Sequence, residues 1–172
     1  MEFPRTSDWR FRLRVRSASS FISPLNHFKK KAGMMWYDTG CRRCVAGPDE
    51  HKKMTAYLFE YGYQPVKIDI NEEFIFGDGE VSRARVAWLY PVFLDGVCVG
   101  AIDIAEVTVP CPCLFSLAMA KKWQIITNHV KQRIHLGLFK HDIPFVDGVP
   151  YIDVFDKIEA CKKAKVPQQF LL

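Results

Sequence analysis

The hydrophobic and polar positions of this chain change period several times, and each change marks a predicted element. Short apolar runs bounded by turn residues predict four strands, at 33–38, 64–70, 91–95 and 97–100. Asp95-Gly96 is expected to join the last two strands as a hairpin. A helix is predicted after the first strand, because apolar residues recur there at helical spacing, at Val45, Met54, Tyr57, Leu58 and Tyr61. The polar–apolar mixture of 72–89 is a candidate for a second helix.

The second half of the chain carries a pattern that predicts mainly helices. Pro110 and Pro112 end any helix that precedes them. Apolar positions then recur at helical spacing over 114–138, with lysines between them, and a terminal helix is expected over 151–163. The pattern therefore predicts three parts: a basic N-terminal arm or transit peptide (1–32), a domain (33–107) and a mainly helical C-terminal extension (108–172).

The segment Cys41-Arg42-Arg43-Cys44 has the clearest chemical meaning. It follows the turn Asp38-Thr39-Gly40 and precedes the predicted helix, so one thiol is expected at the helix N-terminus. There the macrodipole and the unpaired N–H groups favour the thiolate. Because thiol–disulfide exchange needs a thiolate, this arrangement predicts a redox site.

The order strand, Cys-x-x-Cys, helix, strand, helix and hairpin over residues 33–107 resembles that of glutaredoxins, a branch of the thioredoxin fold. The matching segments are Thr39-Gly40-Cys41-x-x-Cys44, Val66-Lys67-Ile68-Asp69, the run from Tyr90 to Gly96, and Val99-Gly100-Ala101-x-Asp103. The resemblance implies an α/β fold with a thioredoxin-like mixed sheet flanked by helices.

The resemblance also implies roles for the candidate site residues. Cys41 would attack a disulfide, and Cys44 would resolve the mixed disulfide, with a protein or glutathione disulfide as the partner. The Tyr90-Pro91 bond would be a cis peptide close to the thiols, and Asp103 would help to bind the amine of glutathione. Glutathione is therefore a possible cofactor.

The chain departs from the glutaredoxin pattern around these residues. Asp38 stands where the family usually has a lysine, and Tyr90 and Ala101 replace the usual valine and glycine. Arg42 and Arg43 replace Pro-Tyr and are expected to stabilise the thiolate and to select acidic substrates. Two functions therefore stay open: a thiol–disulfide oxidoreductase, and a non-catalytic thioredoxin-fold subunit of an organellar complex, such as a mitochondrial ribosome or respiratory assembly.

Positive charge is concentrated at the N-terminus. Residues 1–33 carry a net charge of +6, whereas the whole chain of 172 residues carries +5. This Arg- and Ser-rich composition is typical of a mitochondrial transit peptide, and a cytoplasmic location is the alternative. However, segment 9–16 alternates strictly between apolar residues and arginines, which predicts a strand. A retained arm would present arginines to RNA or to an acidic partner in a larger assembly, through Arg10, Arg12, Arg14 and Arg16.

The remaining sequence features indicate less specific roles. Six cysteines are too few for a disulfide scaffold and suit a reducing compartment. Cys111 and Cys113, together with the Cys41 and Cys44 pair, could supply four zinc ligands, but incidental or buried thiols are the favoured interpretation, so no metal is expected. No apolar run reaches the roughly 18–20 residues of a membrane span.

Overall fold

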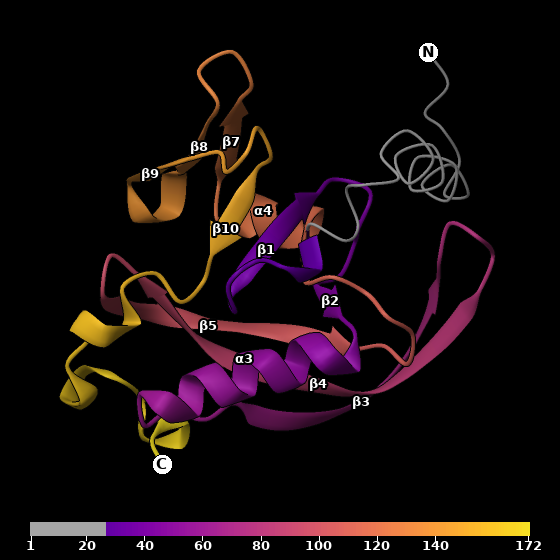
Figure 1. Cartoon of the computed structure of the whole chain (residues 1–172), viewed down its shortest axis with the longest axis horizontal. Helices are drawn as coiled ribbons and strands as arrows, with labels where there is room; N and C mark the ends of the chain where they lie inside the picture. Colours follow the sequence, from indigo (N-terminus) through magenta and orange to yellow (C-terminus); the bar gives the residue numbers. More distant parts are fainter. Residues whose placement is uncertain (1–26) are drawn as a thin grey trace.

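Seven strands form one mixed sheet in which neighbouring strands are often far apart in the sequence (Figure 1). The computed structural model describes residues 27–172, so the alternating segment 9–16 and most of the predicted arm lie outside the described residues. The strands of the sheet, in their spatial order, are β10 (Tyr151–Asp153), β1 (Met34–Asp38), β6 (Leu114–Ser116), β2 (Val45–Ala46), β5 (Val97–Glu106), β4 (Val81–Leu94) and β3 (Val66–Ile75).

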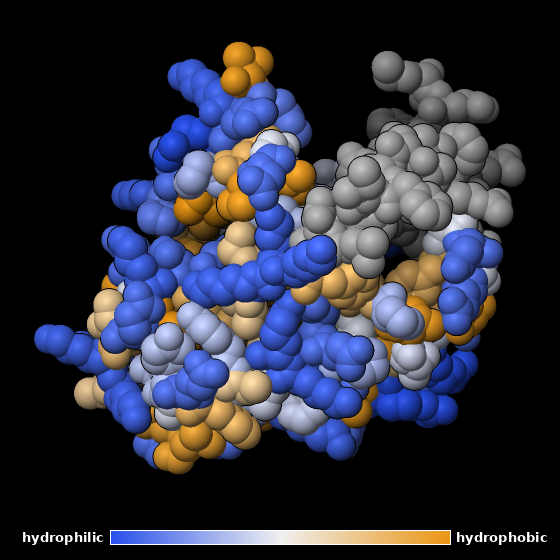
Figure 2. Space-filling view, viewed as in Figure 1, coloured by the Kyte–Doolittle hydropathy of each residue, from blue (hydrophilic) through white to orange (hydrophobic). Residues whose placement is uncertain are grey.

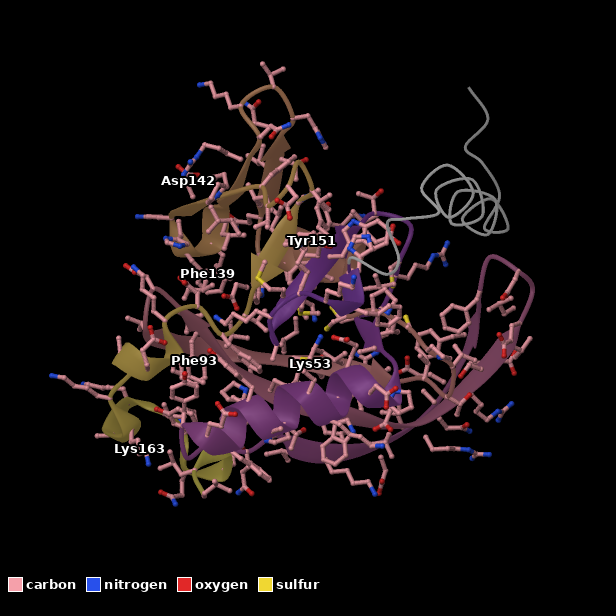
Figure 3. The ribbon with its side chains drawn as sticks, in the orientation of Figure 1. Lys53, Phe93, Phe139, Asp142, Tyr151 and Lys163 are labelled. Carbon is pink, nitrogen blue, oxygen red and sulfur yellow. The ribbon has the colours of Figure 1, made fainter. Side chains whose placement is uncertain are left out.

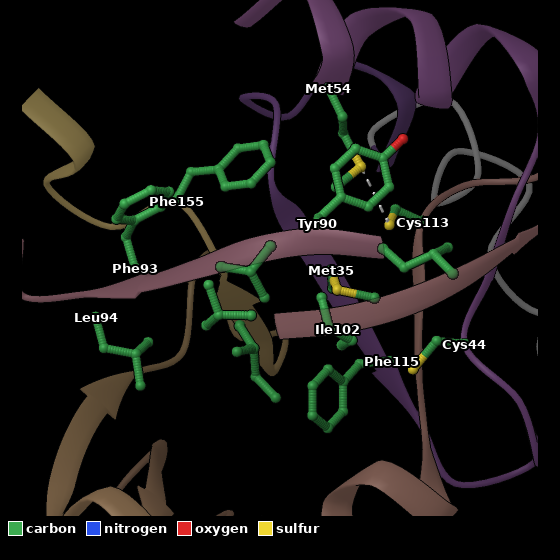
Figure 4. Close-up of a cluster of buried hydrophobic side chains, with 14 of the residues drawn as sticks. Met35, Cys44, Met54, Tyr90, Phe93, Leu94, Ile102, Cys113, Phe115 and Phe155 are labelled. Atoms are coloured by element: carbon green, nitrogen blue, oxygen red, sulfur yellow. Dashed lines mark hydrogen bonds between the residues drawn. The ribbon is translucent and has the colours of Figure 1, made fainter. Parts of the chain in front are cut away.

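The sheet curves until the chain that follows β10 meets β4. The N–H of Phe93, near the end of β4, donates to the carbonyl of Val154 at 2.8 Å, and the N–H of Asp156 donates back to Phe93 at 3.1 Å. These bonds join β4 to the chain that follows β10, so six strands from β10 to β4 form a closed ring. Met35, Ile102 and Phe115 are completely buried and come from three different strands (Figure 4). The core therefore depends on strands from both halves of the chain.

The long helix α3 (Pro48–Glu60) lies in front of β4 and β5 in Figure 1. Pro48 occupies its first turn, where the lack of an N–H has no cost, and two acidic residues follow it near the positive end of the helix dipole. Met54 and Leu58 are four residues apart and both completely buried. They anchor the apolar face of α3 to the core, where Met54 touches Cys113 (Figure 4).

A second, smaller sheet is formed by β7 (Ile125–Asn128), β8 (Arg133–Leu136) and β9 (His141–Pro144). The short helix α4 (Leu117–Lys122) leads into it, and the hydroxyl of Ser116 accepts a hydrogen bond from the N–H of Met119 at its start. Four single 3-10 turns complete the described elements: η1 (Gly137–Phe139), η2 (Ile158–Ala160), η3 (Lys163–Lys165) and η4 (Gln168–Phe170).

The mixed α/β class and the four predicted strands are confirmed. Residues 33–38 and 64–70 correspond to β1 and β3, 91–95 to the end of β4, and 97–100 to the start of β5. The hairpin between β4 and β5 is antiparallel, as predicted. However, the expectation that the first two strands run parallel is wrong. β1 and β3 are separated by β6, β2, β5 and β4, and the pairings between these strands make β1 and β3 run in opposite directions.

The predicted helix over 72–89 is also wrong, because these residues form the β3–β4 hairpin. Their exposure alternates with a period of two: Ser82 and Ala84 are buried, whereas Arg83 and Arg85 are exposed. Small residues on the buried face make this alternation inconspicuous in the sequence. The β3–β4 hairpin extends well beyond the neighbouring strands, at the right of Figure 1.

The predicted helical extension over 108–172 is corrected in the same way. Residues 114–138 form β6, the short α4, β7 and β8, and residues 151–163 form β10 and the 3-10 turn η2. Ile134 and Leu136 are buried and their neighbours Arg133 and His135 are exposed, so these apolar positions have the period of a strand. β6 and β10 flank β1 on its two sides. The C-terminal part of the chain therefore completes the main sheet.

Candidate functional site

A cavity of about 520 Å³ lies between the end of β3 and the loop that follows β1. At the right of Figure 2, over the β3–β4 hairpin, the surface contains both apolar and polar side chains. The cavity is lined by His27, Trp36, residues 40–43, Val45, residues 72–76, residues 110–112 and Leu114. Three segments that are far apart in sequence therefore meet here, and two of them contribute one cysteine of each pair singled out from the sequence, Cys41 and Cys111.

Asp38 ends β1 directly before the cavity wall and is 2% exposed. Its Oδ1 accepts a hydrogen bond of 2.9 Å from the N–H of Gly40, and its carbonyl accepts one of 3.1 Å from the N–H of Cys41. Gly40 and Cys41 line the cavity, so the Asp38-Thr39-Gly40 turn holds a buried carboxylate directly behind the wall. Burial is the main cause that raises the pKa of the Cys41 and Cys111 thiols, and the nearby charge of Asp38 adds to it.

Cys41 and Cys44 lie near each other, but their surroundings oppose thiolate formation. Burial raises the pKa of both thiols. Sγ of Cys41 lies 2.6 Å from the carbonyl oxygen of Arg43, and Sγ of Cys44 accepts a hydrogen bond of 3.3 Å from the N–H of Ser116. Neither cysteine begins a helix, because β2 intervenes and α3 starts only at Pro48. The helix dipole expected to act on Cys41 is therefore absent there.

Arg43 lines the cavity, and its guanidinium is paired there with acidic side chains. The guanidinium of Arg43 pairs with the carboxylate of Asp103, and its Nη1 donates to the Asp103 carbonyl at 3.2 Å. Nε of Arg43 also pairs with Glu72 at 3.2 Å. This network joins the loop after β1 to β3 and β5 beside the cavity. Arg42 also lines the cavity, and it is more exposed than Arg43.

Tyr90 and Pro91 are buried in β4 and do not line the cavity. The predicted cis peptide between them is wrong, because the described residues contain no cis bond. Pro91 lies opposite Ala101 in the β4–β5 pairing, and the regular course of β4 needs a trans bond there. Of the seven predicted site residues, the structure brings Cys41, Arg42 and Arg43 to the cavity and places the other four around or away from it.

The four cysteines considered as zinc ligands approach one another, since the charges of Cys111 and Cys44 affect the pKa of Cys113. However, residues 27–172 contain no group of three or more His, Cys, Asp or Glu side chains placed to hold a metal ion. Cys113 is packed against Met54, and all six cysteines are free thiols.

The most informative residue that the sequence interpretation undervalued is Asp38. In the sequence it stands in the turn before the cysteines and in place of the usual lysine, and neither position predicts a chemical role for its carboxylate. The signal in the sequence is an acidic residue that ends an apolar strand and directly precedes a Thr-Gly turn. A residue at the end of a strand can present its side chain to a cleft. The β3–β4 hairpin, whose β3 end lines the cavity, is not predicted by the sequence, because the polar–apolar mixture of 72–89 fits a helix.

Comparison of the chain with family models, with curated proteins and with solved structures finds no match. Among residues 27–172, no helix is long and apolar enough to cross a membrane.

Proposed function

We propose that this protein is a peptide hydrolase of the aspartic-protease type, with Asp38 as its catalytic carboxylate. The observation that carries the proposal is the buried carboxylate at the end of β1, held by the Gly40 N–H at 2.9 Å behind a cavity that the end of β3 lines. A buried, oriented carboxylate next to a largely apolar cleft is the setting in which carboxyl groups act as general acids and bases.

Extended peptides are the substrates that fit this cleft. One wall is formed by the end of β3, an edge strand whose outer backbone groups have no strand partner among the described residues. An added peptide strand can hydrogen-bond to such an edge, while alternate side chains enter pockets. Phe74, Phe76 and Leu114 line the cavity and favour apolar side chains there.

Hydrolysis by this mechanism needs two carboxyl groups that share one proton. Glu72 and Glu73 also line the cavity, but Glu72 pairs with Arg43 and Glu73 pairs with Arg83. We therefore propose that Asp38 of a second copy supplies the second group. The ionised carboxylate takes a proton from water, whose oxygen attacks the peptide carbonyl. The protonated partner donates its proton, the C–N bond breaks, and a carboxylic acid and an amine are released.

The test is cleavage of a mixture of peptides by the full chain, with a comparison of Asp38→Asn. We expect cleavage next to large apolar residues, with an optimum on the acidic side of neutrality, and a loss of roughly a thousandfold or more in Asp38→Asn. Asp95→Asn is the matched control, because Asp95 lies at the opposite end of β4 from the hairpin tip and does not line the cavity. Sedimentation should show dimers under cleavage conditions. An Asp38→Asn variant with undiminished cleavage, or an active monomer, would refute the proposal.

Thiol–disulfide exchange at Cys41 and Cys44 stays a second proposal, because Cys41 lines the cavity beside the exposed Arg42. In this proposal glutathione or a protein disulfide occupies the cavity and the sheet is related to that of thioredoxin. The raised thiol pKa values and the trans Tyr90-Pro91 bond weigh against it. The non-catalytic subunit of a mitochondrial assembly or ribosome also stays a prediction, as does RNA binding by the arginines of segment 9–16.

A further inference from the structure

Cys98 and Cys161 are half-exposed cysteines that neither proposed chemistry uses. Cys98 is the second residue of β5, directly after the Asp95-Gly96 turn, and Cys161 directly follows the η2 turn. Both side chains pack against the main apolar core. Because the two cysteines are far apart in the sequence, only the fold can bring them together.

The backbone segments that carry the two cysteines touch each other. The N–H of Gly96 donates to the carbonyl of Asp156 at 3.1 Å. A Cβ atom placed on Gly96 would lie only 2.9 Å from the Cβ of Ala160. Cys98 stands two residues after Gly96, and Cys161 stands directly after Ala160. Each cysteine is therefore next to a point at which the β4–β5 turn and η2 are in contact.

A short path of side chains connects the two cysteines. Cys98 lies opposite Phe93 in the antiparallel β4–β5 pairing, so both side chains point to the same face. The ring of Phe93, at the lower left of Figure 3, lies 5.1 Å from the ring of Tyr63. The hydroxyl oxygen of Tyr63 lies 3.5 Å from the carbonyl oxygen of Cys161. Both cysteines therefore approach the same tyrosine.

The electrostatics of this group agree with that arrangement. Burial is the main cause that raises the pKa of Tyr63, and Cys161 adds to it through its charge and a side-chain hydrogen bond, as Cys98 does through its charge. Burial likewise raises the pKa of Cys98, and the charge of Cys161 adds to this shift. Since exposed charges are largely screened beyond about 10 Å, the two thiols lie within that range of each other.

The other four cysteines are less accessible to an oxidant. Cys44, Cys111 and Cys113 are buried. Sγ of Cys41 lies 2.6 Å from the carbonyl oxygen of Arg43, and burial raises the pKa of this thiol. Because thiol exchange needs an accessible thiolate, oxidation should reach the half-exposed pair beside η2 first.

We propose that Cys98 and Cys161 form a reversible disulfide that links the C-terminal segment covalently to the β4–β5 hairpin. The oxidant is a small disulfide such as oxidised glutathione. The thiolate of one cysteine attacks it and releases one reduced glutathione, and the second thiolate attacks the protein sulfur of the mixed disulfide and releases the other. The two protein thiols lose two protons and two electrons, which the oxidant takes up. The proposal does not depend on the chemistry at Asp38 or at Cys41.

The disulfide would fix the start of a segment whose end is already held. After η2 the chain returns to the turn before β3, where the N–H of Gln64 donates to the carbonyl of Phe170 at 2.8 Å. The N–H of Leu172 donates to the carbonyl of Gly62 at 3.1 Å. A link that closes a long loop restricts the unfolded chain, so the oxidised protein should be the more stable form. Since an accessible disulfide is readily reduced, this stability should follow the redox state of the surroundings.

Oxidation of the full chain tests this proposal. After incubation with oxidised glutathione, the remaining thiols are alkylated, and the digested chain is analysed by mass spectrometry without reduction. We expect a peptide that links Cys98 to Cys161 and a melting temperature at least roughly 5 °C above that of the reduced chain. Dithiothreitol should reverse both changes. Cys98→Ser should lose the linked peptide and the shift, whereas Cys41→Ser is the matched half-exposed control and should keep both.

A glutathione redox buffer distinguishes a pair that the fold places together from a chance pair. The ratio of linked to reduced chain should be at least roughly tenfold higher for the folded chain than for the chain in denaturant, because the fold raises the effective concentration of one thiol at the other. Equal ratios would overturn the proposal, as would glutathione that stays attached to either cysteine without a linked peptide. A disulfide between two copies would overturn it too. A link found only between Cys41 and Cys44 would overturn it in favour of thiol–disulfide exchange at the cavity.

Discussion

Nδ1 of His51 on α3 lies 2.6 Å from the hydroxyl oxygen of Tyr90 in β4, and both side chains are buried. Nε2 of the same ring lies 3.3 Å from the carbonyl oxygen of Ala105 in β5. Because that carbonyl can only accept, Nε2 carries the proton and Nδ1 accepts from the Tyr90 hydroxyl. The ring therefore joins α3 to two strands. Tyr90, which the sequence placed in a substrate site, serves the packing of the helix.

The Tyr90→Phe variant should lose about 1–3 kcal/mol of unfolding free energy, because it leaves the buried Nδ1 acceptor without its donor. The ring that packs near Phe155 is retained, so the loss reports on the hydrogen bond. Denaturant unfolding measures it. Tyr63→Phe is the matched control, since its hydroxyl lies at a long 3.5 Å from the Cys161 carbonyl. Equal losses in the two variants would contradict the role of the His51–Tyr90 bond.

Acid should destabilise the protein through His27. Burial, with the charge of Lys30, lowers the pKa of His27 from 6.5 to about 4. The folded state therefore takes up this proton less readily than the unfolded chain. The stability that the neutral His27 side chain contributes is complete above pH 6.5 and is lost as the pH falls toward 4. The difference amounts to at most about 3 kcal/mol.

Thermal or denaturant unfolding measures the stability across this pH range. A comparison of His27→Gln with the parent chain separates the contribution of His27 from that of the carboxylates. The variant should show a shallower loss of stability between pH 6.5 and 4. His129→Gln, in the exposed β7–β8 turn, is the control and should follow the parent chain. Parallel pH profiles for the parent and His27→Gln would exclude this origin of acid sensitivity.

The pairing of Arg43 with Asp103 should stabilise the cavity wall only modestly. A double-mutant cycle with Arg43→Gln and Asp103→Asn should give a coupling of about 0.5–1 kcal/mol, because the Asp103 side chain is 37% exposed and solvent screens the pair. The coupling should fall as salt is added. The exposed Lys157–Asp95 pair is the control and should couple less. A larger and salt-independent coupling would mean that water does not reach the Arg43 network.

The thiols provide a direct test between the two proposed chemistries. Since burial raises the pKa of Cys41 and Cys44, iodoacetamide should label both more slowly than an unfolded thiol at neutral pH. Labelling should become complete in denaturant, and mass spectrometry of peptides measures each site. Rapid labelling of Cys41 at mildly acidic pH would support the thiol–disulfide proposal instead, because that reaction needs a stabilised thiolate.

Gly47 packs closely against the backbone of Cys111, which lines the cavity. A Cβ atom there would lie 2.7 Å from the backbone N of Cys111 and 2.8 Å from the carbonyl oxygen of Val109. Gly47→Ala should therefore cost about 1–3 kcal/mol by pushing the 109–111 loop away. Gly79→Ala is the comparison, since the hairpin tip has open space and only the backbone strain of φ +87° remains. Unfolding measurements that show no difference would contradict this packing.

Local signals in the sequence were sufficient for several elements. Asp95-Gly96 between two apolar runs predicted the β4–β5 hairpin, and its backbone has positive φ at both residues, as a tight hairpin turn needs. Met54 and Leu58, four residues apart, predicted the buried face of α3. These features depend on neighbours within a few residues, and the side-chain period reports them directly.

Local patterns do not predict which strands pair in the sheet or which segments line the cavity. Trp36 pairs with Leu114 on one side and with Tyr151 on the other, and no local pattern specifies partners so distant. For the same reason Ile134 and Leu138, four residues apart, fit a helix in the sequence, whereas residues 133–136 form a strand that pairs with β7 and β9. The sequence by itself determined which residues are apolar and where the tight turns fall. Which strands pair depends on the tertiary structure, because β-pairing joins residues that are far apart along the chain. This pairing places Asp38 directly behind the wall of the cavity that the end of β3 lines.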